Sequence, residues 1–356
     1  MNKTLFTRKS HRKICDHYIA SLDDIDCFDF YSITSNQVVI LDLNKPIYFN
    51  RLIDRFLAVL GKHKVNKFRL VTINVSEKIP RHLVDVILNS NQISHWFTEN
   101  WPYAFQDPKI TIIPIGVAEN FARHWKPADW KPLEDKKPLC LATFQHGIPV
   151  IARSGSPNDR LDCLKALYDQ EWISWAPKMD IQAYIRALSE HAFVISPLGT
   201  RLDCHRTWEA LACGSVPIVK RSTLIPLWRQ FPVCILDEWS KLEKEKISIC
   251  LSNFQNYTTV SALEMLTENY WRDRITGKLE TSVEGLVGKN DIEWQIKSEQ
   301  EIIPMDWTWK FLRYRNPLYA YFDYMTTRLR TREYVNFNAQ DLLSDFRRLK
   351  TRIWKI

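Results

Sequence analysis

Residues 193–220 read FVISPLGTRLDCHRTWEALACGSVPIVK, and their order predicts strand, loop, helix and strand. The apolar run Phe193–Ile195 is stopped by a Ser-Pro-Leu-Gly turn, and a second run, Val216–Val219, follows Gly214. Between them a helix is predicted from Asp203 to Gly214, because glycine accepts the positive φ of a helix C-cap. Two buried strands joined by a helix form a βαβ unit, so the stretch predicts a parallel sheet.

The predicted helix carries charged residues at a regular spacing. Asp203, Arg206 and Glu209 recur every three residues and therefore share one face. An arginine beside the free N–H groups of a helix start suits a phosphate or pyrophosphate. A carboxylate one turn deeper can accept both hydroxyls of a ribose. The alternative for these three residues is a solvated ladder of ion pairs.

Composition is that of an ordinary globular protein: 356 residues, 45% hydrophobic and 25% charged. This length accommodates two domains, and the net charge of +8 permits an anionic partner. The basic start of the chain lacks the apolar core of a signal peptide, and no apolar run reaches membrane-spanning length. We therefore expect a cytoplasmic protein. The 8 cysteines form no Cys-x-x-Cys pair and are expected to be reduced core thiols.

Strands and helices alternate in two consecutive sets. The first set has predicted strands at Val38–Leu41, Phe68–Ile73, Ile93–Phe97 and Ile110–Ile113, and helices at Asn50–Leu60 and Pro80–Leu88. The second adds strands at Leu139–Phe144 and Val233–Leu236, and helices at Asp159–Tyr168, Ile181–Ser189, Leu224–Arg229, Trp239–Leu251 and Ser261–Arg272. Residues 1–30 give no clear assignment. Two such sets predict an α/β fold of two doubly wound, Rossmann-like domains that face a cleft.

The predicted domains are 1–125, a Pro- and Lys-rich linker at 126–137, a second domain at 138–280, and an extension at 281–356. The extension is predicted to be helical and contains clusters of basic and aromatic residues. These clusters suit either packing on the domains or peripheral contact with an anionic membrane. The Asp-x-Asp sequence at 24–26 can bind a divalent metal, but such pairs are common by chance.

Four linked pieces resemble the nucleotide-sugar-binding half of exostosin-like glycosyltransferases. They are the stretches that begin at Phe193, Asp203, Gly214 and Pro232, the last ending at Trp239. Phe68–Asn74, Trp96–Asn100 and Pro108–Gly116 resemble the acceptor-side domain of related proteins. The resemblance covers about Gln37 to Leu251. It implies a GT-B architecture and inverting transfer of a sugar from a nucleotide donor, often without a bound metal.

The resemblance also implies roles for particular residues. Glu209 corresponds to the ribose-contacting acid and Arg206 to a diphosphate contact, with Asp203 and His205 lining the same pocket. Ser196 and Gly199 can bring backbone N–H groups close to phosphate. Arg160, near the start of a helix, is a second candidate phosphate contact or an exposed helix charge.

A catalytic base is also needed, and in this fold it usually comes from the facing domain. Glu119 is the first candidate and Glu99 the second, although either can simply cap a helix or lie in solvent. His146 and His205 lie in predicted loops and are not assigned as bases. Asn74 departs from the expected acceptor-side pattern because asparagine cannot act as a base.

The sequence therefore predicts a hexosyl- or pentosyltransferase that uses a nucleotide sugar, expected to be a UDP-sugar, and a glycan or glycolipid acceptor. No cofactor and no metal site are expected. The alternative is a non-catalytic GT-B-like module that binds an anionic glycan or another polyanion. Nucleic acid is not an expected partner, because the basic residues are dispersed and no nucleic-acid motif appears.

Overall fold

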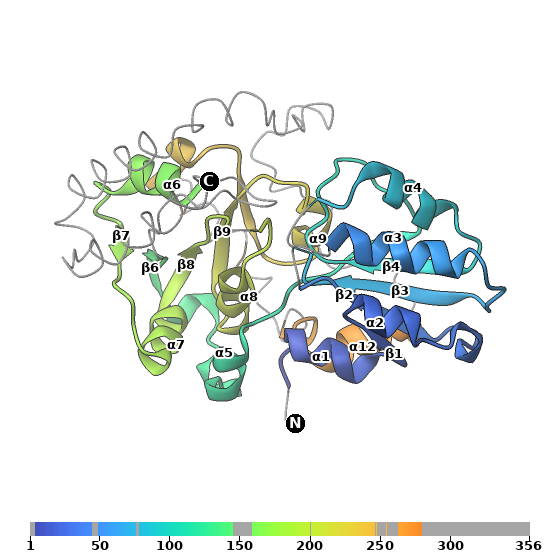
Figure 1. Cartoon of the computed structure of the whole chain (residues 1–356). Helices are drawn as coiled ribbons and strands as arrows, with labels where there is room; N and C mark the ends of the chain where they lie inside the picture. Colours follow the sequence, from blue (N-terminus) through green and yellow to red (C-terminus); the bar gives the residue numbers. More distant parts are fainter. Residues whose placement is uncertain are drawn as a thin grey trace, which may run out of the picture.

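The computed structural model describes residues 4–44, 49–75, 78–144, 159–199, 201–245, 247, 254 and 263–279. The predicted extension at 281–356, His146 and Cys250 lie outside the described residues. Within the described residues, two five-stranded parallel sheets form two halves that lie side by side (Figure 1). No described helix is long and apolar enough to cross a membrane.

The first half contains a sheet whose strands follow one another in chain order, β1-β2-β3-β4-β5. The strands are β1 (His17–Ile19), β2 (Val38–Asp42), β3 (Phe68–Ile73), β4 (Ile93–Thr98) and β5 (Ile110–Ile112). The first half also contains α1 (Arg8–Ile14), α2 (Leu22–Asp26), α3 (Phe49–Leu60) and α4 (Arg81–Asn89), whereas α5 (Glu119–His124) lies against α7 (Ile181–Glu190) of the second half (Figure 1). Strands β2 and β3 are almost entirely buried, which is typical of a parallel sheet covered on both faces.

The second half has the strand order β10-β9-β8-β6-β7, so the order reverses at β6. Its strands are β6 (Lys137–Ala142), β7 (Ile173–Trp175), β8 (His191–Ile195), β9 (Val216–Lys220) and β10 (Cys234–Leu236). Its helices are α6 (Asp159–Leu167), α7 (Ile181–Glu190), α8 (His205–Ala212) and α9 (Ile225–Trp228). In open α/β sheets such a reversal creates a crevice outside the carboxyl ends of the strands, here between β6 and β8.

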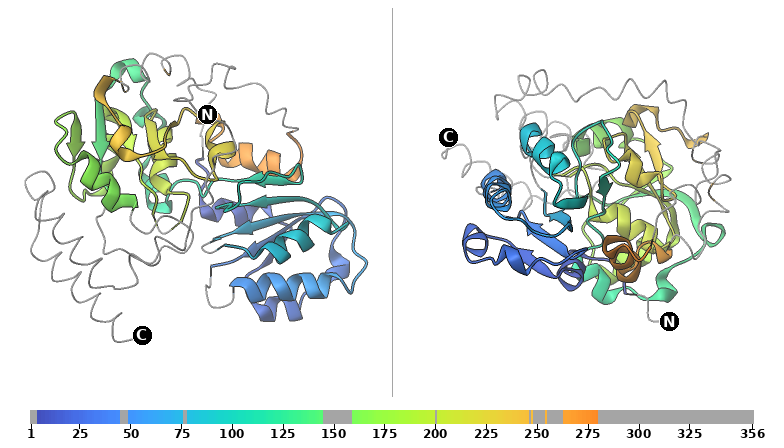
Figure 2. Two further views of the ribbon diagram at one scale, coloured as in Figure 1. Left: turned by 90° about the horizontal axis from the view of Figure 1, so that it is seen from above. Right: turned by 90° about the vertical axis from the view of Figure 1, so that its right-hand side faces the viewer.

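The chain returns to the first half after the second sheet. Helix α12 (Glu268–Thr276) packs against α1, and a strand-like bridge joins Leu5 to Thr267. The ring centroids of Phe6 and Trp271 lie 5.9 Å apart. Figure 1 and the left view of Figure 2 both place α12, in orange, next to the first sheet.

Most predicted elements are present within two residues of their expected ends, but several differ. Helices α1 and α2 and strand β1 lie in the unassigned N-terminal region, and β7 was not predicted. The predicted helix Trp239–Leu251 is wrong at its start, because Trp239–Lys241 forms a single 3-10 turn. The predicted helix Ser261–Arg272 is interrupted: Leu263 and Glu264 are helical, but α12 begins only after its N-cap Thr267, whose hydroxyl accepts from Tyr270 N. The predicted linker forms two 3-10 turns, Pro127–Asp129 and Leu133–Asp135.

The described cysteines are free thiols. Four are buried as expected, but Cys27 is exposed and Cys15 and Cys204 are partly exposed, so these three are not core residues. In the Asp-x-Asp sequence, Asp24 caps α2 through the N–H groups of Ala20 and Ser21, and Asp26 pairs with Arg55. Both aspartates therefore have structural partners.

Candidate functional site

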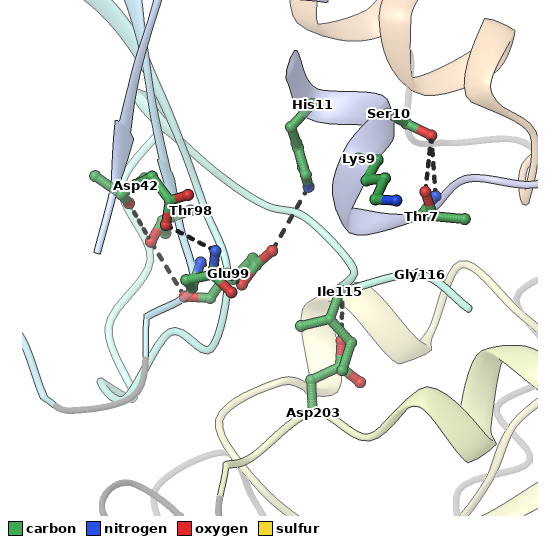
Figure 3. A network of polar contacts seen from close by, with 12 residues as sticks. Thr7, Lys9, Ser10, His11, Asp42, Thr98, Glu99, Ile115, Gly116 and Asp203 are labelled. Carbon is green, nitrogen blue, oxygen red and sulfur yellow. Dashed lines mark hydrogen bonds and ion pairs between the residues drawn. The ribbon is translucent and has the colours of Figure 1, made fainter. Parts of the chain in front are cut away.

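The carboxyl ends of the two sheets meet at a polar seam. We use "the seam" for Asn100 and Ile115–Ala118 of the first half together with Asp203, His205 and Glu209 of the second. Four hydrogen bonds cross it, and they join the backbone before α5 and the Asn100 side chain to the start of α8. Figure 3 shows Ile115 and Asp203 facing each other across this junction.

Asp203 is the most heavily bonded residue of the seam. Its Oδ2 accepts from Ile115 N at 2.9 Å, and its Oδ1 accepts from Cys204 N at 2.8 Å. Trp208 Nε1 donates to both oxygens, and Asp203 N donates to Asn100 Oδ1 at 2.8 Å. Burial raises the pKa of Asp203 to about 7, against the opposing effect of these donors. Its carboxylate oxygens are thus occupied by protein groups.

Glu209 also bridges the halves. Its Oε1 accepts from Ala118 N at 3.2 Å and its Oε2 accepts from the hydroxyl of Tyr184, on α7, at 2.7 Å. Glu209 is 6% exposed and Asp203 is 4% exposed. The alternative of a solvated ladder is therefore wrong: these carboxylates face the first half.

Gly116 permits the close contact of the backbone at the seam. Its φ is +70°, and a Cβ there would lie 2.3 Å from the carbonyl oxygen of Phe6. Only glycine adopts this conformation in this space without strain. The Gly116 carbonyl oxygen is 2.7 Å from Nδ1 of His205. The tight turn therefore places this oxygen as a hydrogen-bond acceptor for the first residue of α8.

Two arginines converge on the other side of the α8 start. Arg206 Nη1 lies 3.8 Å from the sulfur of Cys204, and the Arg160 side chain is also hydrogen-bonded to Cys204. Burial, and then the charge of Arg206, lower the pKa of Arg160. The two guanidinium groups are therefore close enough to repel each other.

This arginine pair lies at the point where the strand order reverses. The Arg206 guanidinium is 5.6 Å from the ring centroid of Phe144, which follows β6. A Cβ on Gly199, in the loop after β8, would lie 3.1 Å from Nη2 of Arg160. Ser196 in the same loop is buried, and its hydroxyl is 3.0 Å from that of Thr207 on α8. The pair thus lies by the carboxyl ends of β6 and β8, where such a crevice is expected.

Asp159, next to the candidate Arg160, has a supporting role that the sequence did not predict. Its Oδ2 accepts from Leu198 N at 2.7 Å, and its Oδ1 accepts from Trp239 Nε1 at 2.9 Å. Burial raises the pKa of Asp159. The carboxylate holds the loop after β8 in place beside Arg160. Its position at a helix start, next to Arg160, was a sequence signal for a role near the site. Its partners Leu198 and Trp239 could not be predicted, because they are 39 and 80 residues away in the chain.

Both candidate bases have partners in the first half. Glu119 begins α5, and its Oε1 accepts from Lys9 N at 3.0 Å. Glu99 is fully buried, its Oε2 accepts from Asn74 N at 2.8 Å, and its Oε1 is 3.5 Å from His11 Nε2 (Figure 3). Burial alone would raise the pKa of Glu99, but His11, Arg8 and Arg201 hold it below its usual value.

The predicted residues thus form two adjacent groups. Arg160, Gly199 and Arg206 surround the crevice, whereas Asp203, His205 and Glu209 belong to the seam. Within the described part of the chain, no three His, Cys, Asp or Glu side chains are grouped to hold a metal ion.

Residues 157–226 match the family model of the RXYLT1 C-terminal domain. The predicted exostosin-like resemblance is thereby confirmed for the segment that contains both arginines. The two five-stranded parallel sheets confirm the predicted α/β architecture of two Rossmann-like domains. A search of curated proteins found no match.

Several solved structures show a remote likeness to the chain. A GtfA/B complex and the pneumococcal O-GlcNAc transferase GtfA in complex with UDP and GlcNAc are each 12% identical, with a TM-score of 0.32. Each match covers 69% of this chain, which spans 56% of the length of those chains. WaaG, a glycosyltransferase involved in lipopolysaccharide biosynthesis, is 8% identical over 67% of this chain and 77% of its own, with a TM-score of 0.33.

Proposed function

We propose that the protein is a glycosyltransferase that moves a sugar from a nucleotide-sugar donor to a glycan or glycolipid acceptor with inversion at the anomeric carbon. The observation that supports the proposal most directly is the pair of arginines at the crevice between β6 and β8. Two guanidinium groups held close together repel each other, and a diphosphate placed between them removes that repulsion.

The same pair suits the chemistry of the leaving group. Transfer breaks the bond between the anomeric carbon and the diphosphate, and the negative charge that develops there needs nearby cations. Arg160 and Arg206 supply two positive charges, so the proposed reaction does not require a divalent metal. The exostosin-like resemblance favours UDP as the nucleotide, and transfer of a hexose or of a pentose fits equally.

The donor site proposed here is smaller than the set of residues predicted from the sequence. Arg160, Arg206 and the loop from Ser196 to Gly199 form it. Glu209 and Asp203 already accept hydrogen bonds from the protein, and we therefore propose that they support α8. A cytoplasmic location and membrane contact through residues 281–356 stay predictions.

Calorimetric titration with UDP and a panel of nucleotide sugars tests the proposal. Arg206→Ala and Arg160→Ala should each weaken UDP binding about tenfold or more, because a charge-assisted hydrogen bond is lost. Arg51→Ala, on the exposed side of α3, is the matched control and should bind normally. Addition of EDTA should leave UDP binding unchanged.

Folded protein that binds no nucleotide would overturn the proposal. The alternative, a non-catalytic module, gives a different result: polyanions bind with a strong dependence on salt, and no donor is turned over. The net charge of +8 is the observation that favours this alternative, so the experiment includes polyanions.

A further inference from the structure

An inverting transferase needs a group that removes the proton of the acceptor hydroxyl. Neither Glu119, which accepts from Lys9 N, nor Glu99, which is fully buried beside His11, is placed to do so. The base is therefore to be sought among partly exposed groups at the start of α8, the helix that also carries Arg206.

His205 is such a group. It is the first residue of α8, stands between Cys204 and Arg206 in the chain, and is partly exposed. Its Nδ1 is 2.7 Å from the carbonyl oxygen of Gly116. A carbonyl oxygen only accepts hydrogen bonds, so the geometry assigns the proton to Nδ1. In the neutral ring, Nε2 then carries a lone pair.

The surroundings keep this ring neutral. Burial lowers the pKa of His205, and the charge of Arg8, on α1, lowers it further. The Gly116 carbonyl, Glu209 on α8 and Glu99 at the end of β4 oppose this effect without outweighing it. Among the described residues, no hydrogen bond engages Nε2, so the basic nitrogen is available to a ligand.

We propose that His205 is the general base of the proposed reaction, with Nε2 accepting the proton of the acceptor hydroxyl. The inference rests on the proposed function. As the proton moves to Nε2, the acceptor oxygen forms a bond to the anomeric carbon. The bond from that carbon to the diphosphate breaks, its electron pair leaves with the nucleoside diphosphate beside Arg160 and Arg206, and His205 later releases the proton to water.

The geometry of the seam explains how the base is oriented. Gly116 belongs to the first half and α8 to the second, so the bond that fixes the ring forms only when the halves are docked. A histidine oriented by a carbonyl at Nδ1 and open at Nε2 has the arrangement that general bases require. A purely structural role would need only the bond from Nδ1.

His205→Asn separates these two roles, because the asparagine amide can still donate to Gly116 while the basic nitrogen is lost. With UDP-sugars as the donor probes, turnover or donor hydrolysis should fall about 10²- to 10⁴-fold. UDP affinity measured by calorimetry should change little. His124→Asn is the matched control, because its Nδ1 also lies 2.8 Å from a carbonyl oxygen, that of Asn120.

The pH profile gives a second readout. Wild-type kcat/KM should rise with pH through one ionisation, at a pKa below the ordinary value of a histidine, and then level off, because His205 must be neutral. In His205→Asn this acid limb should disappear. Wild-type turnover in the variant, with its acid limb retained, would overturn the inference.

Nitrogen NMR of the histidine rings tests the inference without turnover. The expected result for His205 is a neutral ring protonated at Nδ1 at pH 7, and a ring protonated at Nε2 would overturn it. Failure of UDP to bind to the wild type would instead count against the proposed function. The two failures are therefore distinguishable.

Discussion

The carboxylate of Glu209 shows how a single side chain can hold two helices and a loop together. It accepts from Tyr184, on α7, and from the backbone of Ala118, just before α5. Burial, and then the charge of Glu209, raise the pKa of Tyr184 well above its usual value, so the hydroxyl keeps its proton and donates. The carboxylate is thus a structural acceptor on the face of α8 that looks toward the first half.

Replacing Glu209 by glutamine should therefore affect stability more than donor binding. Loss of the charge weakens two buried hydrogen bonds, and we expect the free energy of unfolding to fall by about 1–3 kcal/mol in chemical denaturation. Glu190→Gln, at an exposed ion pair with Lys137, is the control and should be nearly neutral. If UDP binding were lost while pyrophosphate binding and stability stayed normal, Glu209 would contact the ribose after all.

At the scale of elements, Lys136 joins the ends of two helices to the second sheet. Its Nζ donates to the carbonyl oxygens of Leu188 and Ser189, in α7, and of Cys213, just after α8, and to the hydroxyl of Ser215. The carbonyl groups at a helix C-terminus carry partial negative charge, which favours a cation there. Burial nevertheless lowers the pKa of Lys136 to about 8.

Lys136→Met should destabilise the protein by about 1–3 kcal/mol at pH 7, because four buried acceptors lose their donor. Between pH 8 and 10.5 the unfolded chain holds a proton on Lys136 that the folded chain has released. The contribution of Lys136 to stability therefore rises with pH over this range. Chemical denaturation of the wild type and of Lys136→Met between pH 8 and 10.5 measures this contribution. Lys137→Met, at a side chain that is 58% exposed, should show neither effect.

At the scale of the molecule, the two halves share one core. A continuous cluster of buried side chains includes Val71 and Trp96 of the first half and Val194 and Trp208 of the second. A second cluster, with Cys140 and Phe193, covers the other face of the second sheet. Together with the bonds of the seam, the shared core ties the stability of each half to the other.

We therefore expect the two halves to unfold in one calorimetric transition, with equal calorimetric and van't Hoff enthalpies. Asp203→Ala leaves two donors, Ile115 N and Trp208 Nε1, without their acceptor. The substitution should therefore lower Tm without splitting the transition. Two resolved transitions in the wild type would contradict a shared core. The exposed Asp85, in an ion pair with Arg81, provides the control substitution to alanine.

The parts of this architecture that could be predicted are those set by local sequence. Continuous apolar runs such as Phe68–Ile73 predict buried strands, and the turn before Arg206 predicts a helix start at a sheet edge. The three-residue strands β1 and β7 each contain a single aliphatic residue, Ile19 and Ile173, whereas β5 and β10 are equally short but lie in the apolar runs that predicted them. The seam could not be predicted, because its partners are 88 to 103 residues apart. The sequence identified Arg206 and Asp203 but not which of them faces the crevice.

The return of α12 to the first half has a topological consequence. The second half is inserted between two segments, one ending near α5 and one beginning at Thr267, that belong to the same body. While that body is folded, an unfolded second half is a closed loop rather than a free chain. Closure removes conformational entropy from its unfolded state, and this removal grows only slowly with the length of the loop. The bridge from Leu5 to Thr267 therefore stabilises the folded second half without contacting it, because it restricts the conformations that the unfolded second half can adopt.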